Sequence, residues 1–526
     1  MLNILPIFLT LTLAGCTLNK QLEGELDSNS STPSTPETPD NPTPPPAPLE
    51  CDNTITNDFG GGDGSAGDPY RICSLEQWNH FSQTSSTWDK FIRLEDDLDF
   101  TGVTYPNFNT VGTVGTPFIG TFEGNNKSIS NISINAIASN FAIFMYTDQN
   151  ATFKDLTLQN NSITTTGYIG GLIYTHSANG TLTLQNITNN NLTLNSQSRA
   201  GGLVYESTGT LNVDQVTISN LTAPTSDYTG GLIGGLYKAS NFSNVTLSNI
   251  NFYAHSTSEL FLGGLVGAGY DGAANATFNF DNIQATGIAI TGSNNKTSAL
   301  LGSFEGFGNS MIINISNSTV TGNMACVQCG ALIGYASVQT INISKSSFVG
   351  DMPFSDVTVS GGLVGIAYAD NFQMDESFAI ANITGWTASI GGLIGQLTTN
   401  VASSINDCYV QGNLVTTHAS DGYPGGLIGN HAGAGTLTIN RSYFAGIVTG
   451  NHVQKGCIAN GGGGGTLVLN NVRFDSTTCT VGAVGSAAYT GATGSITAQL
   501  QSGTPIGGWS LTLWNFASGF YPQLVW

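Results

Sequence analysis

The sequence predicts an all-β protein, a parallel β-helix (β-solenoid) of about twelve ~31-residue repeats with a short N-terminal capping helix. Three observations predict this fold. Only 9% of the 526 residues are charged, while glycine supplies 67 and 40% are hydrophobic. A cassette of glycines around a leucine recurs along the chain at nearly constant spacing. Each cassette is followed by short apolar runs that alternate with Ser, Thr and Asn, as half-buried strands do.

The charge balance excludes one class of partner. The chain has 13 Lys and Arg against 34 Asp and Glu, which gives a formal net charge of −21. A protein this acidic repels phosphate and has no basic stripe to offer, so we expect no nucleic-acid partner.

Residues 1–15 predict a lipoprotein signal peptide. Their apolar core is shorter than the ~20 residues that cross a bilayer, and it runs into Leu13-Ala14-Gly15-Cys16. This tetrapeptide resembles the bacterial lipobox, in which the cysteine receives a diacylglycerol and the signal is cut just before it. The resemblance implies lipidation of Cys16 and a membrane partner reached through that anchor. We therefore expect the chain in the cell envelope, at the outer membrane or the cell surface.

Residues 16–50 predict a tether that begins at the lipidated cysteine. Eight of the 17 prolines lie between Pro33 and Pro48, among Ser and Thr residues. Such a segment favours the extended polyproline II conformation and pairs poorly into sheets or helices.

Residues 51–135 predict an N-terminal cap and the first coils. Ser74-Leu75-Glu76-Gln77 has the pattern of a capping box and opens a short helix that carries Leu75, Trp78 and Phe81 on one face. A solenoid needs its open end covered, so we interpret this helix as the cap.

Residues 136–490 predict the repeat solenoid, which rests on the motif Gly-Gly-Leu-Ile/Val-Gly. Complete copies span 230–234, 263–267, 361–365, 391–395 and 425–429, and relaxed copies centre on Ile143, Leu172, Leu203, Leu300, Leu332, Cys457 and Ala483. We expect the central residues to form one internal ladder and the paired glycines to permit a sharp corner or a close backbone approach.

The repeat resembles the GLUG repeat of bacterial surface proteins, among them adhesin-like chains and some IgA-specific metalloproteases. The ends agree with the resemblance: Gly60-Gly61-Gly62-Asp63-Gly64 with Asp68-Pro69-Tyr70-Arg71-Ile72 resembles the usual opening, and Phe118-Ile119-Gly120-Thr121-Phe122-Glu123-Gly124-Asn125 a first coil. Residues 491–526 are interpreted as a C-terminal coil and closing motif, on Trp514 and 519–526. The resemblance implies a β-solenoid on a lipid-anchored surface protein.

The cysteines predict disulfides, because an exported chain meets an oxidising compartment. The candidate pairs are Cys51 with Cys73, Cys326 with Cys329 and Cys457 with Cys479. Cys408 occupies the position that is Ser442 in the next coil, so we expect a buried thiol there. A Cys-x-x-Cys motif could instead bind metal or cycle redox, but this one lacks two further ligands. We expect no metal site and no cofactor.

Catalytic motifs are not evident. None of the six histidines is followed by Glu, so the His-Glu-x-x-His motif of a metalloprotease is absent. The densest acidic cluster, Glu95-Asp96-Asp97-Leu98-Asp99, lies in the capping region, and acidic residues do not recur as pairs in the cassettes. Calcium at Asp58, Asp63 and Asp68 stays open, because the loop matches no calcium repeat. We expect no catalytic residues and a protein that is not an enzyme.

One pattern hints at binding. Tyr168, Tyr228 and Tyr423 each lie two residues before a Gly-Gly pair, and Trp386 lies five before Gly391. If those turns share an edge, they offer sugar rings a row of aromatic faces. The sequence therefore favours an adhesin-like multivalent scaffold for surface glycans or proteins of another cell. A polysaccharide-degrading β-helix and a passive surface-coat protein are the alternatives.

Overall fold

The computed structural model describes residues 50–526, which form one compact unit. It leaves out 105–106, 138, 197, 226–227, 255–259, 272, 274, 292–294, 307–309, 325–327, 354–358, 386–388, 418–421, 452–453, 461–463 and 486–488. The predicted signal peptide, Cys16 and nearly all of the tether lie outside the described residues.

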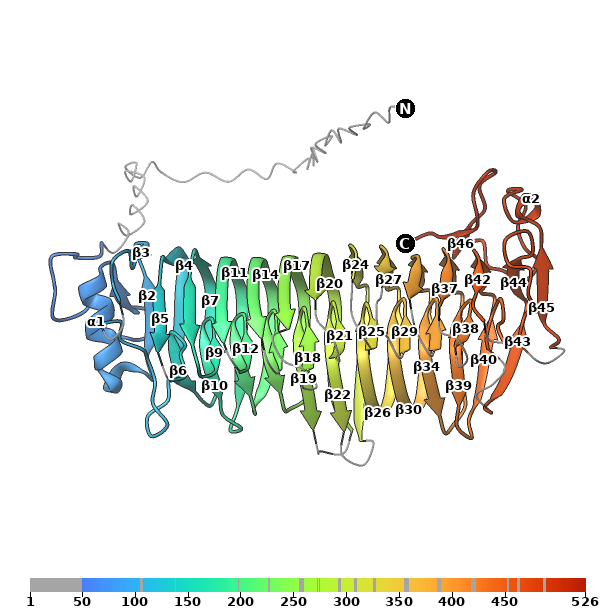
Figure 1. The fold of residues 1–526 in the computed structure, drawn as a ribbon. Coiled ribbons are helices and arrows are strands. Elements are labelled where there is room, and N and C mark those ends of the chain that lie inside the picture. The colour runs from blue at the N-terminus through green and yellow to red at the C-terminus, as the bar shows by residue number, and fades with distance from the viewer. Residues whose placement is uncertain are drawn as a thin grey trace, which may run out of the picture. The chain divides into compact units, whose positions relative to one another are not determined.

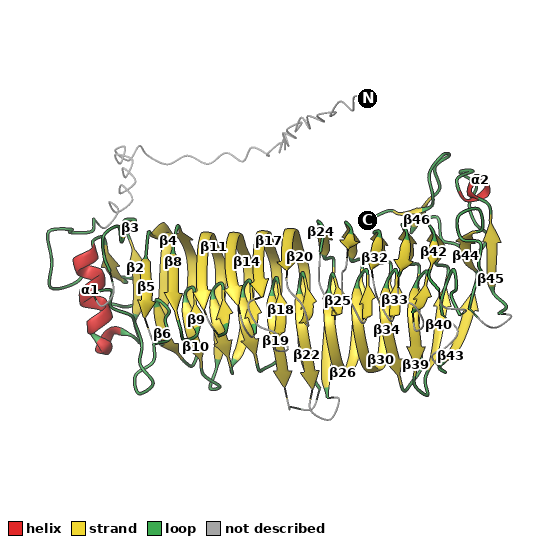
Figure 2. Ribbon diagram, in the orientation of Figure 1, coloured by secondary structure: helices red, strands yellow, loops and turns green. Residues whose placement is uncertain are grey.

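The predicted fold class is confirmed. The described chain is nearly all β and winds into a parallel solenoid of about 11 turns at ~31-residue spacing. Each strand pairs in parallel with its equivalent one coil on, and the antiparallel exception in the described chain is the pair β46–β47. Figure 1 shows the coils stacked in chain order, and Figure 2 shows how little helix accompanies them.

The strands fall into sets that share a position in the coil. One long side is built from β6 (Phe144–Thr147), β10 (Ile173–His176), β13 (Val204–Ser207), β16 (Ile233–Leu236), β19 (Val266–Asp271), β22 (Leu301–Gly306), β26 (Ile333–Ser344), β30 (Val364–Asp375), β34 (Ile394–Thr399) and β39 (Ile428–Ala432). The nine-stranded corner sheet comprises β9 (Ile169–Gly170), β12 (Ala200–Gly201), β15 (Thr229–Gly230), β18 (Leu260–Gly263), β21 (Asn295–Ser298), β25 (Gln328–Gly330), β29 (Val359–Gly361), β33 (Ser389–Gly391) and β38 (Tyr423–Gly425).

The remaining strands complete the coils and their ends. The other sides contain β4 (Thr121–Ser130), β5 (Ser133–Ile137), β7 (Thr152–Gln159), β8 (Ser162–Thr165), β11 (Thr181–Ser196), β14 (Thr210–Thr225), β17 (Ser240–Ala254), β20 (Ala276–Thr291), β23 (Met311–Ser316), β24 (Thr319–Thr321), β27 (Ser347–Val349), β28 (Met352–Pro353), β31 (Phe378–Ile380), β32 (Ile383–Gly385), β35 (Ser403–Asn406), β36 (Tyr409–Gln411), β37 (Leu414–Thr416), β40 (Thr436–Asn440), β41 (Tyr443–Ala445), β42 (Val448–Thr449), β43 (Thr466–Asn470) and β44 (Val472–Asp475). The ends add β1 (Tyr70–Ile72), α1 (Leu75–Gln83), the 3₁₀ turn Ser85–Thr87, β2 (Phe91–Leu94), β3 (Leu98–Asp99), β45 (Ala492–Ser495), α2 (Thr497–Leu500), β46 (Trp514–Asn515) and β47 (Gln523–Leu524).

The paired glycines have distinct steric roles. A Cβ on the first glycine would lie within 2.3 Å of the carbonyl oxygen three residues on, as at Gly230 and Gly391, so the chain there turns too tightly for a side chain. A Cβ on the second, as at Gly231, would meet the carbonyl of the next coil. The expected corner and the expected close approach are therefore both present.

A second corner in each coil is left-handed. The ladder from Asp155 through Asn186 and Asn244 to Asn471 has φ between 44° and 55° at every coil. Asparagine and aspartate, which tolerate this conformation better than most residues, occupy seven of these positions, and the others are Gln215, Lys345, Glu376 and Arg441.

Asparagine amides also form hydrogen bonds between coils. In one ladder Asn241, Asn279, Asn314 and Asn342 each donate to the asparagine of the preceding coil over 2.7–3.0 Å.

The central residues of the cassettes form the expected internal ladder, with one correction. The central leucines from Leu172 to Leu427 are fully buried, and backbone hydrogen bonds connect the cassettes of successive coils at this position. In the coil after Leu427, the ladder position is occupied by Ile458, because Gly425 pairs with Gly456 and Ile428 pairs with Ala459. The sequence prediction of Cys457 was therefore wrong by one residue. Cys457 takes the slot of the second glycine.

The N-terminal helix covers the first coils, as expected. The Ser74 hydroxyl accepts from the Gln77 amide at the start of α1, and the Trp78 and Phe81 rings are fully buried. The Trp78 ring packs edge-to-face against the rings of Phe122 and Phe144 in the first coils, with centroid distances of 6.2 and 6.1 Å. The capping box is only half formed, because the Gln77 side chain accepts from the Cys73 amide instead of the Ser74 amide.

The C-terminal residues 506–526 form a strap along the side of the last coils. Outward rings of Phe378, Tyr409 and Tyr443 stack at the same strand position in successive coils. The strap places Trp514 against Tyr409 and Tyr443, and its indole nitrogen donates to Asp407 Oδ1 over 3.0 Å. The predicted closing motif thus packs on these stacked rings beside the core.

A ladder of buried hydroxyls runs beneath the left-handed corner. The side chains of Ser318, Ser346, Ser377 and Ser442 each accept from a backbone amide of the preceding coil. Cys408 takes the place of serine between Ser377 and Ser442, and its sulfur accepts from the Ser377 amide over 3.4 Å. Burial raises the pKa of this free thiol. The expected buried thiol is confirmed.

Cys408→Ser should leave the free energy of unfolding within about 1 kcal/mol of the wild-type value, because serine restores the ladder hydroxyl. Cys408→Val should cost about 1–3 kcal/mol, because it leaves the Ser377 amide buried without an acceptor. Urea denaturation measures both variants. Equal stability of the serine and valine variants would contradict a hydrogen-bonding role for this position.

Two histidines occupy one inward position near opposite ends of the stack. His176 pairs with Thr147, and His431 follows Leu397 at the equivalent place in a late coil. His431 Nε2 shares a hydrogen bond with the Thr399 hydroxyl over 3.2 Å. Burial lowers the pKa of His431 from its ordinary 6.5 to about 4, and it lowers the pKa of His176 as well. Both rings are therefore neutral at pH 7.

The free energy of unfolding should fall as the pH drops from 6.5 to 4. Over this range His431 binds a proton in the unfolded chain but stays neutral in the folded chain. The contribution of this group reaches about 3 kcal/mol at the lower limit. His431→Leu introduces the residue type of Leu397, which occupies this position in the preceding coil. The variant should lose this contribution to the dependence of the unfolding free energy on pH. Thermal melting of both proteins from pH 7 to 4 measures the difference. Parallel curves would contradict the assignment.

Candidate functional site

The structure places three of the four predicted aromatic residues at one register position of the corner sheet. Strand pairing aligns Tyr168 with Arg199 and Arg199 with Tyr228, since Ala200 pairs with both Ile169 and Thr229. Tyr423 occupies the same register position, but it lies six coils beyond Tyr228. Trp386 lies outside the described residues. The structure therefore brings Tyr168 and Tyr228 together and leaves Tyr423 apart.

A guanidinium separates the two neighbouring tyrosines. Arg199 Cζ lies 4.1 Å from the centroid of the Tyr228 ring and 6.0 Å from that of Tyr168. The Tyr168 ring also stacks on Tyr205 at 4.9 Å, and Tyr228 stacks on Phe261 at 4.6 Å. These faces are occupied by neighbouring side chains of the protein, so the two rings present mainly their edges to solvent.

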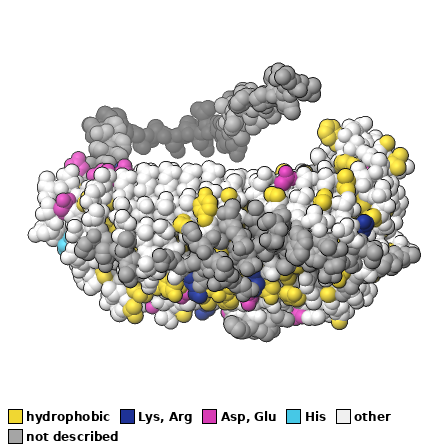
Figure 3. Space-filling model, viewed as in Figure 1, with side chains coloured by type: hydrophobic (Ala, Val, Ile, Leu, Met, Phe, Trp, Pro, Cys, Tyr) yellow, Lys and Arg dark blue, Asp and Glu magenta, His cyan; other side chains and the backbone are white. Residues whose placement is uncertain are grey.

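The contacts continue as a tyrosine row along one side of the stack. Lys296 Nζ lies over the Phe261 ring and 4.0 Å from the centroid of the Tyr335 ring. The Tyr335 and Tyr368 ring centroids are 5.9 Å apart. The row consists of Tyr168, Tyr174, Arg199, Tyr205, Glu206, Tyr228, Tyr237, Phe261, Tyr270, Lys296, Glu305, Tyr335 and Tyr368. Figure 3 shows hydrophobic side chains gathered over the lower strands of that view, with basic and acidic side chains among them, on a surface otherwise largely without charge.

Charges within the row are balanced locally. Lys296 Nζ lies 3.1 Å from Glu305 Oε1. Partial burial raises the pKa of Glu206, although a hydrogen bond with Tyr205 and the charge of Arg199 oppose the rise. Burial also raises the pKa of Tyr174 to about 12, so this hydroxyl stays protonated at physiological pH. The row therefore offers hydroxyl groups and ring edges, with one cation near each carboxylate.

The two carboxylates of the row are far apart. Glu206 shares a register position with Ser303, three coils on, and Glu305 follows Ser303 on the same strand. Three coils at ~4.8 Å separate them by about 14 Å, which is wider than either carboxylate spacing of a glycosidase.

The acidic cluster of the capping region is occupied by structural hydrogen bonds. Asp97 Oδ1 accepts from the Ser128 amide and hydroxyl at 2.7 and 2.9 Å. Asp99 accepts from Thr101 and Asn131, and these bonds lower its pKa. The cluster thereby fastens the first coil to the cap.

The predicted cysteine pairs are found where the structure describes them. Disulfides join Cys51 to Cys73 and Cys457 to Cys479. Cys329 is disulfide-bonded, and Cys326, its predicted partner, lies outside the described residues, as does Cys16. The described residues hold no cluster of three or more His, Cys, Asp or Glu that could bind a metal ion. No helix among them has the length and apolarity needed to cross a bilayer.

Sequence reasoning missed most of the row. Arg199 and Phe261 stand two residues before a glycine pair, as Tyr168 and Tyr228 do, but a search for tyrosine and tryptophan passes over them. Aligning the cassettes would have found them. Tyr335 and Tyr368 lie beyond the cassette, and their place follows from the register of β26 and β30.

Arg199→Ala should lower the free energy of unfolding by about 1 kcal/mol, because it removes the cation between two aromatic faces. Arg199→Lys should retain part of that energy, since an ammonium keeps the charge but lacks the planar stacking surface. Thermal unfolding measures both, with Lys238→Ala, a change at an exposed lysine, as the control. Equal loss from Arg199→Ala and Lys238→Ala would contradict the intercalated geometry.

Comparison with known proteins leaves the family open. No family model matches the chain, so membership of the GLUG-repeat family stays a prediction. Among curated proteins, halomucin of Haloquadratum walsbyi (strain DSM 16790 / HBSQ001) is 33% identical over 112 residues, which are 21% of this chain and 1% of halomucin.

Among solved structures, a candidate immunoglobulin A1 protease from Bacteroides ovatus aligns over 89% of this chain and 95% of its own. The identity is 14% and the TM-score is 0.27, a likeness that carries no argument.

Proposed function

We propose that this chain is a lipid-anchored, adhesin-like surface protein that binds carbohydrate along its solenoid and catalyses no reaction. The observation that carries the proposal is the tyrosine row, which presents ring edges and hydroxyls on successive coils of one side. Ring edges with nearby hydroxyl and amide groups suit a sugar polymer by apolar contact and hydrogen bonding, because neighbouring side chains cover the faces of the stacked rings. A repeating polymer would meet a repeating surface.

Multivalency supplies the affinity in this proposal. Each contact along the row is weak, and a stiff stack of coils holds the contacts in register, so that binding at one coil raises the effective concentration at the next. The proposal extends to the N-terminal region. A lipid on Cys16 and the proline-rich tether would present the solenoid from the cell envelope, at the outer membrane or cell surface, to glycans or proteins of another cell.

The full chain carrying Cys16→Ser, which cannot receive lipid, should co-migrate with a surface polysaccharide in size-exclusion chromatography and leave its length unchanged. Retention reports binding, and the polymer elution volume reports cleavage. A heat-unfolded sample provides the control. Shortened polymer would contradict the proposal and favour the degradative β-helix, whereas failure to retain any polysaccharide of a broad panel would favour a passive coat.

A further inference from the structure

Tyr368 differs from the other tyrosines of the row in what flanks its ring. Strand pairing places Ser337 of the preceding coil and Thr398 of the following coil at the same outward position. Tyr168 and Tyr228, by contrast, have Arg199 between them. With short side chains on both sides, the Tyr368 ring has no stacked neighbour at its own position, and 38% of the residue is exposed.

Two neighbouring side chains fix the orientation of the Tyr368 ring. The Gln396 amide donates to the Tyr368 hydroxyl over 3.1 Å, and Tyr335 contacts the ring at 5.9 Å with an interplanar angle of 56°. Lys296 lies over the Tyr335 ring and pairs with Glu305. Tyr368 is therefore positioned before any ligand arrives, and preorganisation of this kind reduces the entropy lost on binding.

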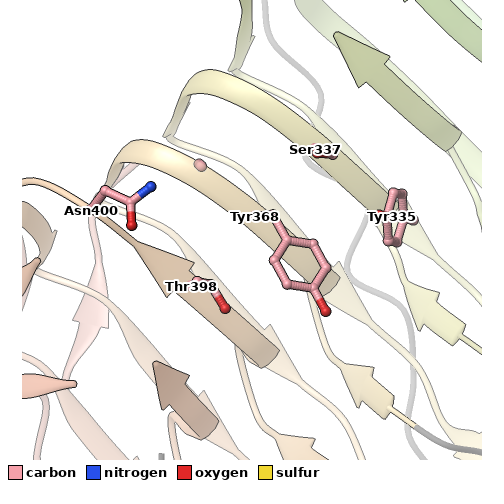
Figure 4. Close-up of a pocket in the computed structure, with 6 residues that line it drawn as sticks. Tyr335, Ser337, Tyr368, Thr398 and Asn400 are labelled. Atoms are coloured by element: carbon pink, nitrogen blue, oxygen red, sulfur yellow. The ribbon is translucent and has the colours of Figure 1, made fainter. Parts of the chain in front are cut away.

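A hollow opens beside this ring. It has a volume of about 300 Å³ and is lined by Tyr335, Ser337, Tyr368, Ala369, Thr398 and Asn400. Figure 4 shows Tyr368 standing between Ser337 and Thr398, with Asn400 and Tyr335 at the sides. The volume lies at the lower end of the range for small-molecule sites.

The lining has the chemistry of a neutral sugar site. It contains no Asp, Glu, Lys or Arg. Within the described residues, neither the Ser337 nor the Thr398 hydroxyl makes a side-chain hydrogen bond, so both can donate to or accept from a ligand. The Asn400 amide nitrogen donates to Asp370 over 2.8 Å, which leaves its carbonyl oxygen as an acceptor.

We propose that the hollow at Tyr368 is a binding subsite for one neutral pyranose unit of a polysaccharide, which stacks on the Tyr368 ring and hydrogen-bonds to Ser337, Thr398 and Asn400. This inference rests on the proposed carbohydrate-binding function and assigns it a place and a ligand class. An acidic sugar would meet a protein of net charge −21 with no cation in the lining of the hollow.

Affinity electrophoresis tests the subsite, because the acidic full chain with Cys16→Ser migrates in native gels that contain a polysaccharide. The probes are the neutral polymers β-glucan, galactomannan and arabinogalactan, with polygalacturonate as the acidic comparison. Tyr368→Ala should raise the dissociation constant for the bound neutral polymer at least tenfold. Tyr253→Ala, which removes a tyrosine that is 48% exposed on another side of the coil, should leave it unchanged.

A second variant separates lost binding from lost folding. Ser337→Phe keeps Tyr368 and covers one of its faces, so it should weaken binding to the same extent while circular dichroism and the melting temperature stay at wild-type values.

Three outcomes would overturn the inference. If the wild-type chain binds a neutral polymer and Tyr368→Ala binds it equally well, the subsite is wrong while the proposed function stands. If polygalacturonate binds more tightly than every neutral probe, the ligand class is wrong. If the wild-type chain binds none of the polymers, the proposed function fails and the subsite fails with it.

Discussion

The structure depends on a tight backbone turn at the corner of each coil, where glycine stands in every complete cassette. At the first glycine of each complete cassette the chain turns so tightly that a Cβ would lie within 2.3 Å of a carbonyl oxygen of the same coil. This turn directs the following leucine into the core and leaves the residue two before the glycine facing outward. Where the glycine is replaced by Ser298, the serine hydroxyl accepts from the amides of Leu300 and Leu301 and thereby joins the turn. The corner therefore sets both the core and the outer surface of each coil.

Once the corner is set, each outward position recurs at the spacing of one coil, and the neighbouring coil decides what an aromatic residue can do. A ring whose neighbour is another ring or a guanidinium has its faces covered and contributes to stability, as Tyr168 does beside Arg199. A ring whose neighbours at the same position are serine and threonine has no stacked partner there and can receive a ligand, as at Tyr368. The difference between packing and recognition thus lies in the residues one coil away.

The repeat made most of the fold predictable, because the paired glycines and the central leucine have steric tasks that recur along the stack. The capping helix was predictable for the same reason, since Ser74 and the apolar face of residues 75–81 act locally. Cys457 was misplaced because the cassette is irregular there and only strand pairing identifies Ile458. The outer surface was largely missed, because the Arg199 contacts and the uncovered ring of Tyr368 depend on register between coils, which a search within one cassette does not reveal.

The C-terminal strap has a consequence for how the stack comes apart. A repeat array ordinarily frays from its end, one unit at a time, since each unit contacts only its neighbours. The strap contacts Phe378 through Trp526, Tyr409 and Asp407 through Trp514, and Asp475 through the Tyr521 hydroxyl. These contacts span four successive coils, so the coils from Phe378 to Asp475 cannot separate from one another while the strap holds. The last coils are thereby tied into one cooperative unit, which denies a protease the frayed edge where digestion of a repeat array would begin.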